Sequence, residues 1–384
     1  MADSAQRMLA EIRQLAPDIH TRTAQIEAGR QLPVDLVEAM RSIGVFRMYV
    51  PQSHGGLAFD IPTAMKVVQL LSRIDGSVGW CAGIGATAPV FATRLPRKTY
   101  DHMYRHGPNV IVAGAVQPTG TIKETAGGWR VDGRWAFASG CTHADWLFGI
   151  CVVTANGKPL AGPDGSGEPP MLRGVMLPAG DWQIEDTWNT AGLKGTGSHH
   201  IALKDAIVPA DNLFDPVNGV PCVAGAIYDA VAHVLPPMGS AIAVGIAEGA
   251  LDAIVELANT GRQQFRMAVP MRDSEIFQCE LGRIEAELRA ARSLHGAEAD
   301  NLSRRAQAGT LKDDALYTRC TQSTVWIANA CVRVADACFA LGGGAAVYDS
   351  SPLQQRLRDL HVLMQHAALH QRHYVTAGKM LLRG

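Results

Sequence analysis

Hydrophobic periodicity changes twice along this chain of 384 residues, and the order of those changes limits the possible folds. Apolar side chains first recur at helical spacing, as at Leu36 and Met40, and this pattern continues to about residue 112. Short apolar runs and alternating stretches, which are typical of strands, follow over 113–214. Long helical patterns then return over 215–384. The order predicts an α+β protein with an N-terminal helical domain (1–112), a central β-domain (113–214) and a C-terminal four-helix bundle (215–384).

Turn-forming residues mark further boundaries inside this pattern. In the β-domain, Gly-Gly at 127–128 and Asp-Gly at 132–133 are turn signals between alternating residues. A polar stretch rich in proline and glycine at 156–170 predicts a surface loop. After a glycine-rich break, the periodicity predicts one last helix from about 351 to 382.

The glycine-rich segments do not fit the common dinucleotide-binding fold. That fold needs G-x-G-x-x-G at a turn between a strand and a helix, within alternating βα units. The candidates are GIGATAP in a helical stretch, GTGSHH before a strand and LGGGAA between helices. None has the required context, so NAD binding of the Rossmann type is not expected.

Composition excludes several other classes of protein. The formal net charge is −1, so no global field would recruit nucleic acid or an anionic membrane. No run of about 18 apolar residues predicts a membrane span, and the N-terminus lacks the apolar core of a signal peptide. The eight cysteines include no C-x-x-C pair, which favours buried free thiols in the cytoplasm.

Three segments together resemble the acyl-CoA dehydrogenase superfamily. GRWAFASGCTHADWLFG at 133–149 is similar to its flavin-contacting segment. DTWNTAGLKGTGSHHIALKDAIVPADNLF at 186–214 and ALGGGAAVYDSSPLQQRLRDL at 340–360 are similar to its next two signatures, in the same order and spacing. The resemblance covers nearly the whole chain and implies the same fold with a homotetrameric assembly.

The end of the chain favours one branch of this superfamily. Acyl-CoA dehydrogenases need a carboxylate base, which in many members follows the last signature by about two helical turns. This chain has no Asp or Glu after Asp359, and His366 stands near the expected place. FASGC-x-H-A-D-W, GTGS and RDL…QH together resemble the two-component flavin monooxygenases. The alternatives are an acyl-CoA dehydrogenase or oxidase with its base elsewhere, and a non-catalytic member that binds flavin or another ligand.

The branch implies a reaction and its partners. Reduced flavin, FMNH2 or FADH2, would come from a separate NAD(P)H:flavin reductase. It would react with O2 at C4a to give a hydroperoxide that hydroxylates an aromatic or polyketide-like small molecule. No nucleic acid or membrane partner is expected.

Two residues are predicted to be catalytic. Ser139 ends a strand where its oxygen can accept a hydrogen bond near flavin N5, although a serine there can also simply satisfy its own turn. His366 is the candidate base for a phenolic proton, although a histidine at such a place is often structural. His370 follows His366 at helical spacing, but no carboxylate or cysteine completes a metal site and none is predicted.

The resemblance also implies contacts with the cofactor and the substrate. Arg262 and Phe265 match an element that meets the flavin phosphates of a neighbouring subunit, and Phe339 replaces a glutamine that helps to hold the adenine of FAD, so FMN and FAD both remain candidates. The predicted cofactor-binding residues are Trp135, Phe137, Ser139, Thr196, Gly197, Ser198, Arg262, Phe265, Gly342 and Gly343. The predicted substrate pocket comprises His143, Trp80, Gln117 and His366.

Overall fold

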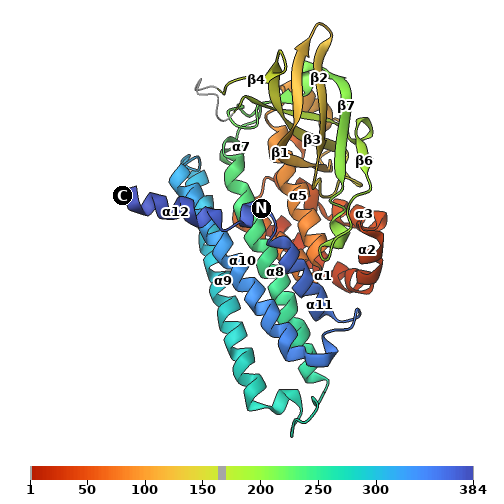
Figure 1. The fold of residues 1–384 in the computed structure, drawn as a ribbon, viewed down its shortest axis with the longest axis vertical. Helices are drawn as coiled ribbons and strands as arrows, with labels where there is room; N and C mark the ends of the chain where they lie inside the picture. Colours follow the sequence, from red (N-terminus) through yellow and green to blue (C-terminus); the bar gives the residue numbers. More distant parts are fainter. Residues whose placement is uncertain (1, 163–169, 384) are drawn as a thin grey trace.

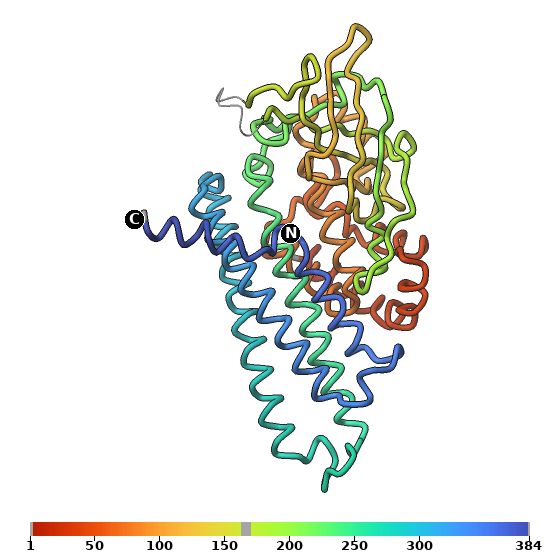
Figure 2. The backbone as a smooth tube through the Cα atoms, in the orientation of Figure 1, coloured from red at the N-terminus to blue at the C-terminus, as the bar shows by residue number. Residues whose placement is uncertain are grey.

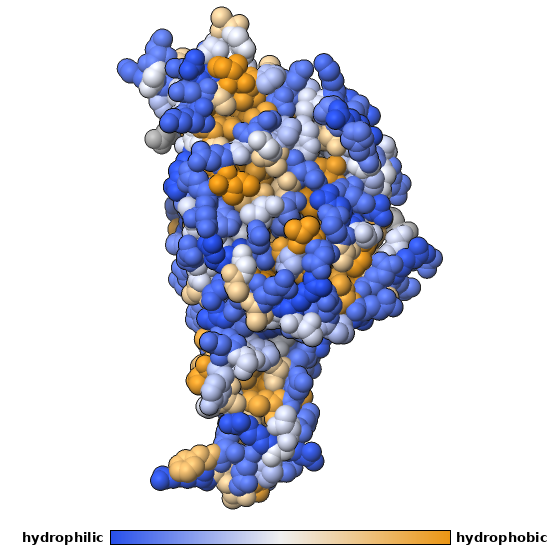
Figure 3. All heavy atoms as spheres, turned by 90° about the vertical axis from the view of Figure 1, so that its right-hand side faces the viewer, coloured by the Kyte–Doolittle hydropathy of each residue, from blue (hydrophilic) through white to orange (hydrophobic). Residues whose placement is uncertain are grey.

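The computed structural model describes residues 2–162 and 170–383 and shows the expected α+β order (Figure 1). N-terminal helices lie beside a sheet, and long helices form a bundle that extends away from both. Residues 163–169 of the expected polar loop lie outside the described residues. On the face seen in Figure 3, hydrophilic residues predominate and hydrophobic ones gather in separate patches.

The elements have the following bounds. The N-terminal helices are α1 (Ala2–Thr21), α2 (Thr23–Gly29), α3 (Val34–Ile43), α4 (Ile61–Ile74), α5 (Gly76–Ala92) and α6 (Arg97–Met103). The strands are β1 (Val112–Thr125), β2 (Gly128–Trp135), β3 (Trp146–Ala155), β4 (Lys158–Pro159), β5 (Leu172–Pro178), β6 (Gln183–Glu185), β7 (His200–Val208) and β8 (Leu213–Phe214). The remaining helices are α7 (Ala226–Asp229), α8 (Val231–Asn259), α9 (Glu275–Gln307), α10 (Asp314–Gly342), α11 (Pro352–Leu363) and α12 (Arg372–Arg383).

Helix α5 is the central helix of the molecule. Asp75 begins it by accepting hydrogen bonds from the N–H groups of Ser77 and Val78. Nearly every residue of α5 is buried, because the helix packs between the sheet and α8. The N-terminal helices and the bundle therefore share one hydrophobic core, and the sheet has a second core of its own.

The sheet has the strand order β6-β7-β2-β1-β3-β5-β8, with β4 paired to β3. The β1–β3 pair is parallel and the other pairs are antiparallel. The turn expected at Asp132–Gly133 is wrong, because both residues lie inside β2. Gly133 is needed there for space: a Cβ at this position would lie 2.7 Å from the Trp135 ring.

Glycines allow α8 to approach α4 closely. A Cβ at Gly245 would lie 2.3 Å from the carbonyl oxygen of Gln69, and one at Gly249 would lie 2.6 Å from that of Arg73. Helix α10 is the one described helix whose length and apolar composition would suit a membrane span, and half of that stretch is buried. It packs against α8, α9 and α11, so the bundle core accounts for its apolar character.

The single last helix expected over 351–382 is wrong, because the chain leaves the helix after Leu363 and forms α12 only from Arg372 (Figure 2). Two histidines account for the break. The Nδ1 atoms of His366 and His370 accept hydrogen bonds from backbone N–H groups two residues further on, which offers the backbone an alternative to the helix. The two rings therefore do not share one helical face. Within residues 2–162 and 170–383, no three His, Cys, Asp or Glu side chains are grouped as metal ligands would be.

Candidate active site

Two loops of the sheet hold Ser139. The first leaves β2 at Phe137, which has a left-handed backbone (φ 64°) and a side chain that is 63% exposed. The second precedes β7 and contains Gly197, also left-handed. Backbone hydrogen bonds join the two loops, from the N–H of Ala138 to the oxygen of His199 and from the N–H of Gly140 to the oxygen of Thr196. The pairing fixes the position of Ser139 between them.

A chain of hydroxyl groups runs inward from Ser139. Its Oγ lies 2.7 Å from Oγ of Ser198, which lies 2.7 Å from Oγ1 of Thr196. The Thr196 hydroxyl donates to the carbonyl oxygen of Leu193 at 2.8 Å. The side chains of Ser139, Thr196 and Ser198 are all buried, and the cofactor contacts predicted for Thr196 and Ser198 stay predictions.

A buried carboxylate anchors the inner end of this chain. Oδ1 of Asp359, on α11, accepts a hydrogen bond of 2.6 Å from the N–H of Leu193, whose backbone is left-handed (φ 49°). Burial, and then the nearby Asp75, raise the pKa of Asp359 to about 7. The anchor was not predicted from the sequence, where the only signal was the acid of the R-D pair that ends the last signature.

Trp80, on α5, joins Ser139 to the C-terminal segment. Its Nε1–H donates to Oγ of Ser139 at 2.8 Å. Its ring meets the ring of His366 edge-on, with centroids 5.3 Å apart and planes at 66°. The structure therefore brings together three residues that the sequence singled out from separate segments.

His366 lines the open side of this group. Its side chain is accessible to solvent, yet protein atoms surround it closely enough to lower its pKa below the ordinary value of 6.5. A pKa below 6.5 leaves the imidazole neutral at pH 7. The backbone N–H of Ala368 donates to Nδ1 at 3.2 Å, which leaves the proton of the neutral ring on Nε2. In this tautomer the ring presents a donor, and the role of His366 as a base stays a prediction.

Of the two other residues of the predicted pocket, His143 lies near Ser139, and Gln117 has no described contact with this group. His143 is close to the Ser139 loop, since a Cβ at Gly140 would lie 3.0 Å from its Nε2. Burial lowers the pKa of His143 to about 4, and within the described chain its Nδ1 has no partner. Gln117 is exposed in the irregular part of β1, and the contacts described here do not join it to Trp80 or His366. Its place in a pocket stays a prediction.

Trp135 does not contact a cofactor, contrary to expectation. Its side chain is completely buried in the core of the sheet, where Nε1 donates to the carbonyl oxygen of Ile150 at 2.7 Å. Its ring packs against Trp182, with centroids 5.4 Å apart. The residue supports the end of β2, from which the Ser139 loop leaves, and offers no surface to a ligand.

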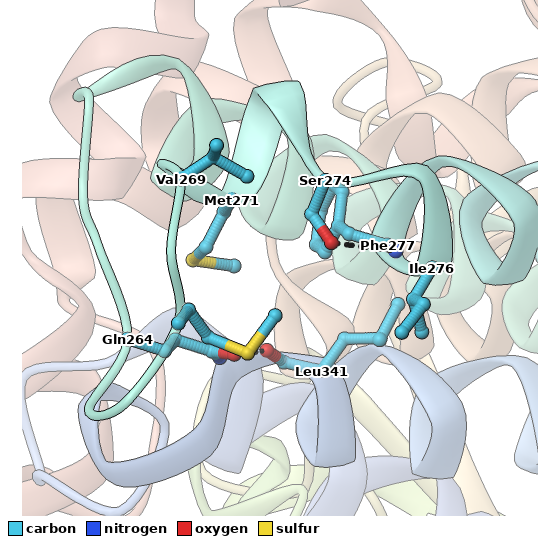
Figure 4. A pocket seen from close by; sticks show the side chains of 8 residues that line it. Gln264, Val269, Met271, Ser274, Ile276, Phe277 and Leu341 are labelled. Carbon is cyan, nitrogen blue, oxygen red and sulfur yellow. Dashed lines mark hydrogen bonds between the residues drawn. The ribbon is translucent and has the colours of Figure 1, made fainter.

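The remaining predicted cofactor residues form a second group at the far end of the bundle. The loop that carries Arg262 and Phe265 meets the end of α10, where Nε2 of Gln264 donates to the oxygen of Leu341 at 2.8 Å and Gly343 lies against Gln264 (Figure 4). Gly342 is buried under Leu353. Helix α11, about 18 Å long, separates this group from His366. Within one subunit the two groups are therefore apart.

The measured cavities lie outside the Ser139 group. A small one of about 70 Å³ is lined by residues of the 264–277 loop and Leu341 (Figure 4). A cleft of about 640 Å³ opens between α1, α4, α8 and the start of α11. It is lined by opposite charges such as Arg73 and Asp252, whose atoms lie 2.6 Å apart. Neither cavity includes Ser139 or His366, so the site is identified by its hydrogen bonds and not by its volume.

The side chains around Ser139 suit an aromatic ring that carries polar ring atoms. Phe137 presents its exposed ring beside Ser139 and meets Trp188 edge-on, with centroids 6.3 Å apart. The Ser139 oxygen keeps one lone pair free after its bonds to Trp80 and Ser198. The buried carboxylates of the described chain are engaged elsewhere: Asp75 and Asp359 hold backbone N–H groups, and Glu248 pairs with Arg292 at 3.1 Å.

Two models of one protein family match the chain. Residues 2–93 match the acyl-CoA dehydrogenase N-terminal domain, and residues 238–371 match the acyl-CoA dehydrogenase C-terminal domain. The matches cover the helices on both sides of the sheet, which confirms the fold expected from the three sequence segments.

Relatives with assigned activities align over almost their whole length. The indole-3-acetate monooxygenase of Acinetobacter baumannii is 30% identical, over 96% of this chain and 92% of its own. The flavin-dependent monooxygenase oxygenase subunit HsaA of Mycobacterium tuberculosis is 27% identical, over 95% and 92%. The structure of XiaF from Streptomyces, in complex with FADH2 and glycerol, has the same fold, with a TM-score of 0.89, 24% identity and coverage of 99% and 96%. The chain therefore belongs to the acyl-CoA dehydrogenase superfamily and, within it, to the flavin-dependent monooxygenases, which are oxidoreductases.

Proposed function

We propose that the chain is the oxygenase component of a two-component monooxygenase that hydroxylates an electron-rich aromatic molecule. It would receive FMNH2 or FADH2 from a separate NAD(P)H:flavin reductase and use O2 as co-substrate. The observation that carries the proposal is the contact of Trp80 with both Ser139 and His366, which joins a cofactor-facing acceptor to a substrate-facing donor. Relatives named as oxygenase subunits support the separate reductase.

The flavin ring would lie against Phe137 and Ser139. When bound, reduced flavin supplies the two electrons that allow one atom of O2 to enter the substrate while the other leaves as water. Ser139 would hold the flavin by accepting a hydrogen bond from it, and the exposed ring of Phe137 would pack against it. The apolar walls from α5 exclude bulk water from this end of the site.

The substrate would lie beside His366. A phenolic substrate that has lost its proton to water would accept a hydrogen bond from Nε2 of His366, which favours the ionised form, the stronger nucleophile. Trp80 holds the imidazole ring in place through the edge-on contact. An acyl-CoA dehydrogenase would need a carboxylate here, and the three buried carboxylates of the described chain bind other groups: Asp75 and Oδ1 of Asp359 hold backbone N–H groups, and Glu248 pairs with Arg292.

Isotope labelling tests the proposed reaction directly. Reduced FMN or FAD, supplied by a flavin reductase and NADH, is mixed with the protein, ¹⁸O2, catalase and either indole-3-acetate or resorcinol. We expect one ¹⁸O atom in an aromatic product by mass spectrometry, and slower reoxidation of the protein-bound reduced flavin than of free flavin. Reoxidation at the free rate with no label in either compound would contradict the proposal.

We further propose that the protein is a homotetramer in which α12 contacts another subunit. Val375 and Leu382 are spaced seven residues apart on one helical face and are 57% and 89% exposed. Helix α12 packs against α10 and its C-terminal end projects beyond the bundle (Figure 1), and both side chains stay exposed within the subunit. The Arg262 group would meet a cofactor bound to a neighbouring subunit.

Charge placed on that face should weaken the assembly. The double variant Val375→Glu, Leu382→Glu is expected to dissociate at protein concentrations where the wild type stays intact, because each carboxylate would be buried without a partner. Sedimentation velocity measures the change. Thr376→Glu adds a charge at an exposed position on another side of α12 and should leave the mass unchanged. If the double variant sediments as the wild type does, α12 is not part of the subunit interface.

A further inference from the structure

The hydroxyl chain behind Ser139 has one direction, which can be derived by counting protons. Each hydroxyl has a single proton, and a carbonyl oxygen only accepts. Thr196 lies 2.8 Å from the Leu193 carbonyl and therefore gives its proton to that oxygen. The Thr196 oxygen then accepts the proton of Ser198 at 2.7 Å, and the Ser198 oxygen accepts the proton of Ser139 at 2.7 Å.

Trp80 completes the assignment at the outer end. An indole N–H only donates, so the Trp80 hydrogen bond of 2.8 Å occupies one lone pair of the Ser139 oxygen. The proton of Ser139 is already directed inward to Ser198. One lone pair is left, so Ser139 offers the site an acceptor and no donor.

The inner end of the chain holds this direction because the Leu193 carbonyl can only accept, and other hydrogen bonds fix its peptide group in place. The N–H of Leu193 is bound by Asp359, and its carbonyl also receives hydrogen bonds from Nε1 of Trp188 at 3.2 Å and from the Thr196 backbone N–H at 3.1 Å. Thr196, Ser198 and Ser139 are 1%, 3% and 4% exposed. Bulk water therefore does not offer these hydroxyls an alternative partner.

We propose that this chain makes the site select reduced over oxidised flavin. N5 of reduced flavin carries a proton, whereas N5 of oxidised flavin carries a lone pair. An oxygen that only accepts hydrogen bonds therefore favours binding of reduced flavin and disfavours binding of oxidised flavin. Thr196 and Ser198 are positioning residues that act through Ser139. The inference rests on the proposed function, because it requires flavin at Ser139.

The test compares two changes at Thr196. Thr196→Val keeps the shape of the side chain and removes the hydroxyl, so Ser198 loses its acceptor and can turn its proton toward Ser139. The Ser139 proton is then released toward the flavin, which favours oxidised N5. Thr196→Ser keeps the hydroxyl and the direction. Ser240→Ala removes another buried, hydrogen-bonded serine hydroxyl, one that pairs with His295 on α9, and controls for general loss of packing.

The readout is a ratio of dissociation constants, measured by anaerobic titration with oxidised and dithionite-reduced FMN and FAD. We expect wild type, Thr196→Ser and Ser240→Ala to prefer the reduced form, and Thr196→Val to lose roughly tenfold of that preference, which is the effect of about one hydrogen bond. The ¹⁵N chemical shift of labelled N5 in oxidised flavin should move in Thr196→Val alone, because only there does N5 gain a donor.

Other outcomes separate the inference from the proposed function. An unchanged ratio in folded Thr196→Val would overturn the hydroxyl chain as the cause while leaving flavin binding intact. If the wild-type protein binds neither reduced FMN nor reduced FAD, both the inference and the proposed function are overturned. If Thr196→Val does not fold, Ser198→Ala removes the acceptor of Ser139 directly and must lower the same ratio.

Discussion

His366→Phe is expected to lower kcat/KM for a phenolic substrate by roughly 10²–10³, whereas His366→Asn should stay within about tenfold of wild type. Phenylalanine keeps an aromatic ring against Trp80 and removes the donor. Asparagine loses the ring and keeps an N–H group that can reach a substrate oxygen. The pair therefore separates the packing of His366 from its hydrogen bond.

The pH profile distinguishes the donor from a base. The pKa of His366 lies below 6.5, so a base at this position would be active above that pKa and lost as the pH falls through it, at the same pH for every substrate. A donor that selects the ionised substrate gives an acid limb that follows the pKa of the substrate itself. We expect the midpoint to shift when a phenol is replaced by a more acidic halogenated phenol.

Flavin affinity serves as the control for these variants. His366 contacts Trp80 through its ring edge, and neither substitution alters the hydrogen bond from Trp80 to Ser139. The dissociation constant of reduced flavin should therefore remain that of wild type. If His366→Asn is as slow as His366→Phe, and the midpoint of the acid limb is the same for every substrate, then His366 acts as a base.

The fold could be predicted because it depends on local patterns, and the same patterns indicated the residues of the candidate site. The change from helical to alternating spacing at about residue 112 reports the start of β1, and the motifs report Ser139 and His366. The break after Leu363 could not be predicted, because the apolar periodicity continues through it. The break arises where His366 and His370 accept hydrogen bonds from backbone N–H groups.

The orientation of the side chains at and after the end of β2 could not be predicted from the sequence either. Strand alternation puts Val131, Gly133 and Trp135 on one face and would put Phe137 there as well. The left-handed backbone at Phe137 turns its ring outward instead, so Trp135 is in the core while Phe137 is exposed. The bond between Asp359 and Leu193 joins residues 166 positions apart, and no local pattern encodes such a contact.

Trp135→Ala tests the packing role assigned to this residue and should have the largest effect on stability. Three glycines enclose the ring: Cβ atoms at Gly120, Gly133 and Gly149 would lie 2.1, 2.7 and 2.6 Å from it. Because these positions have no side chains that could move into the space, the cavity cannot collapse. We expect a loss of about 3–5 kcal/mol in the free energy of unfolding by urea.

Trp129→Ala on the same strand is the matched control, because that side chain is only partly buried and its removal should cost less. At temperatures well below unfolding, the Trp135→Ala protein should still bind reduced flavin, since the indole lies within the sheet and its Nε1 bonds to the Ile150 carbonyl. Loss of flavin binding with unchanged stability would instead make Trp135 a wall of the cofactor site. Stability lost with flavin binding retained would mean that the packing of the sheet, and not a ligand, requires a tryptophan at the end of β2, just before the loop that carries Ser139.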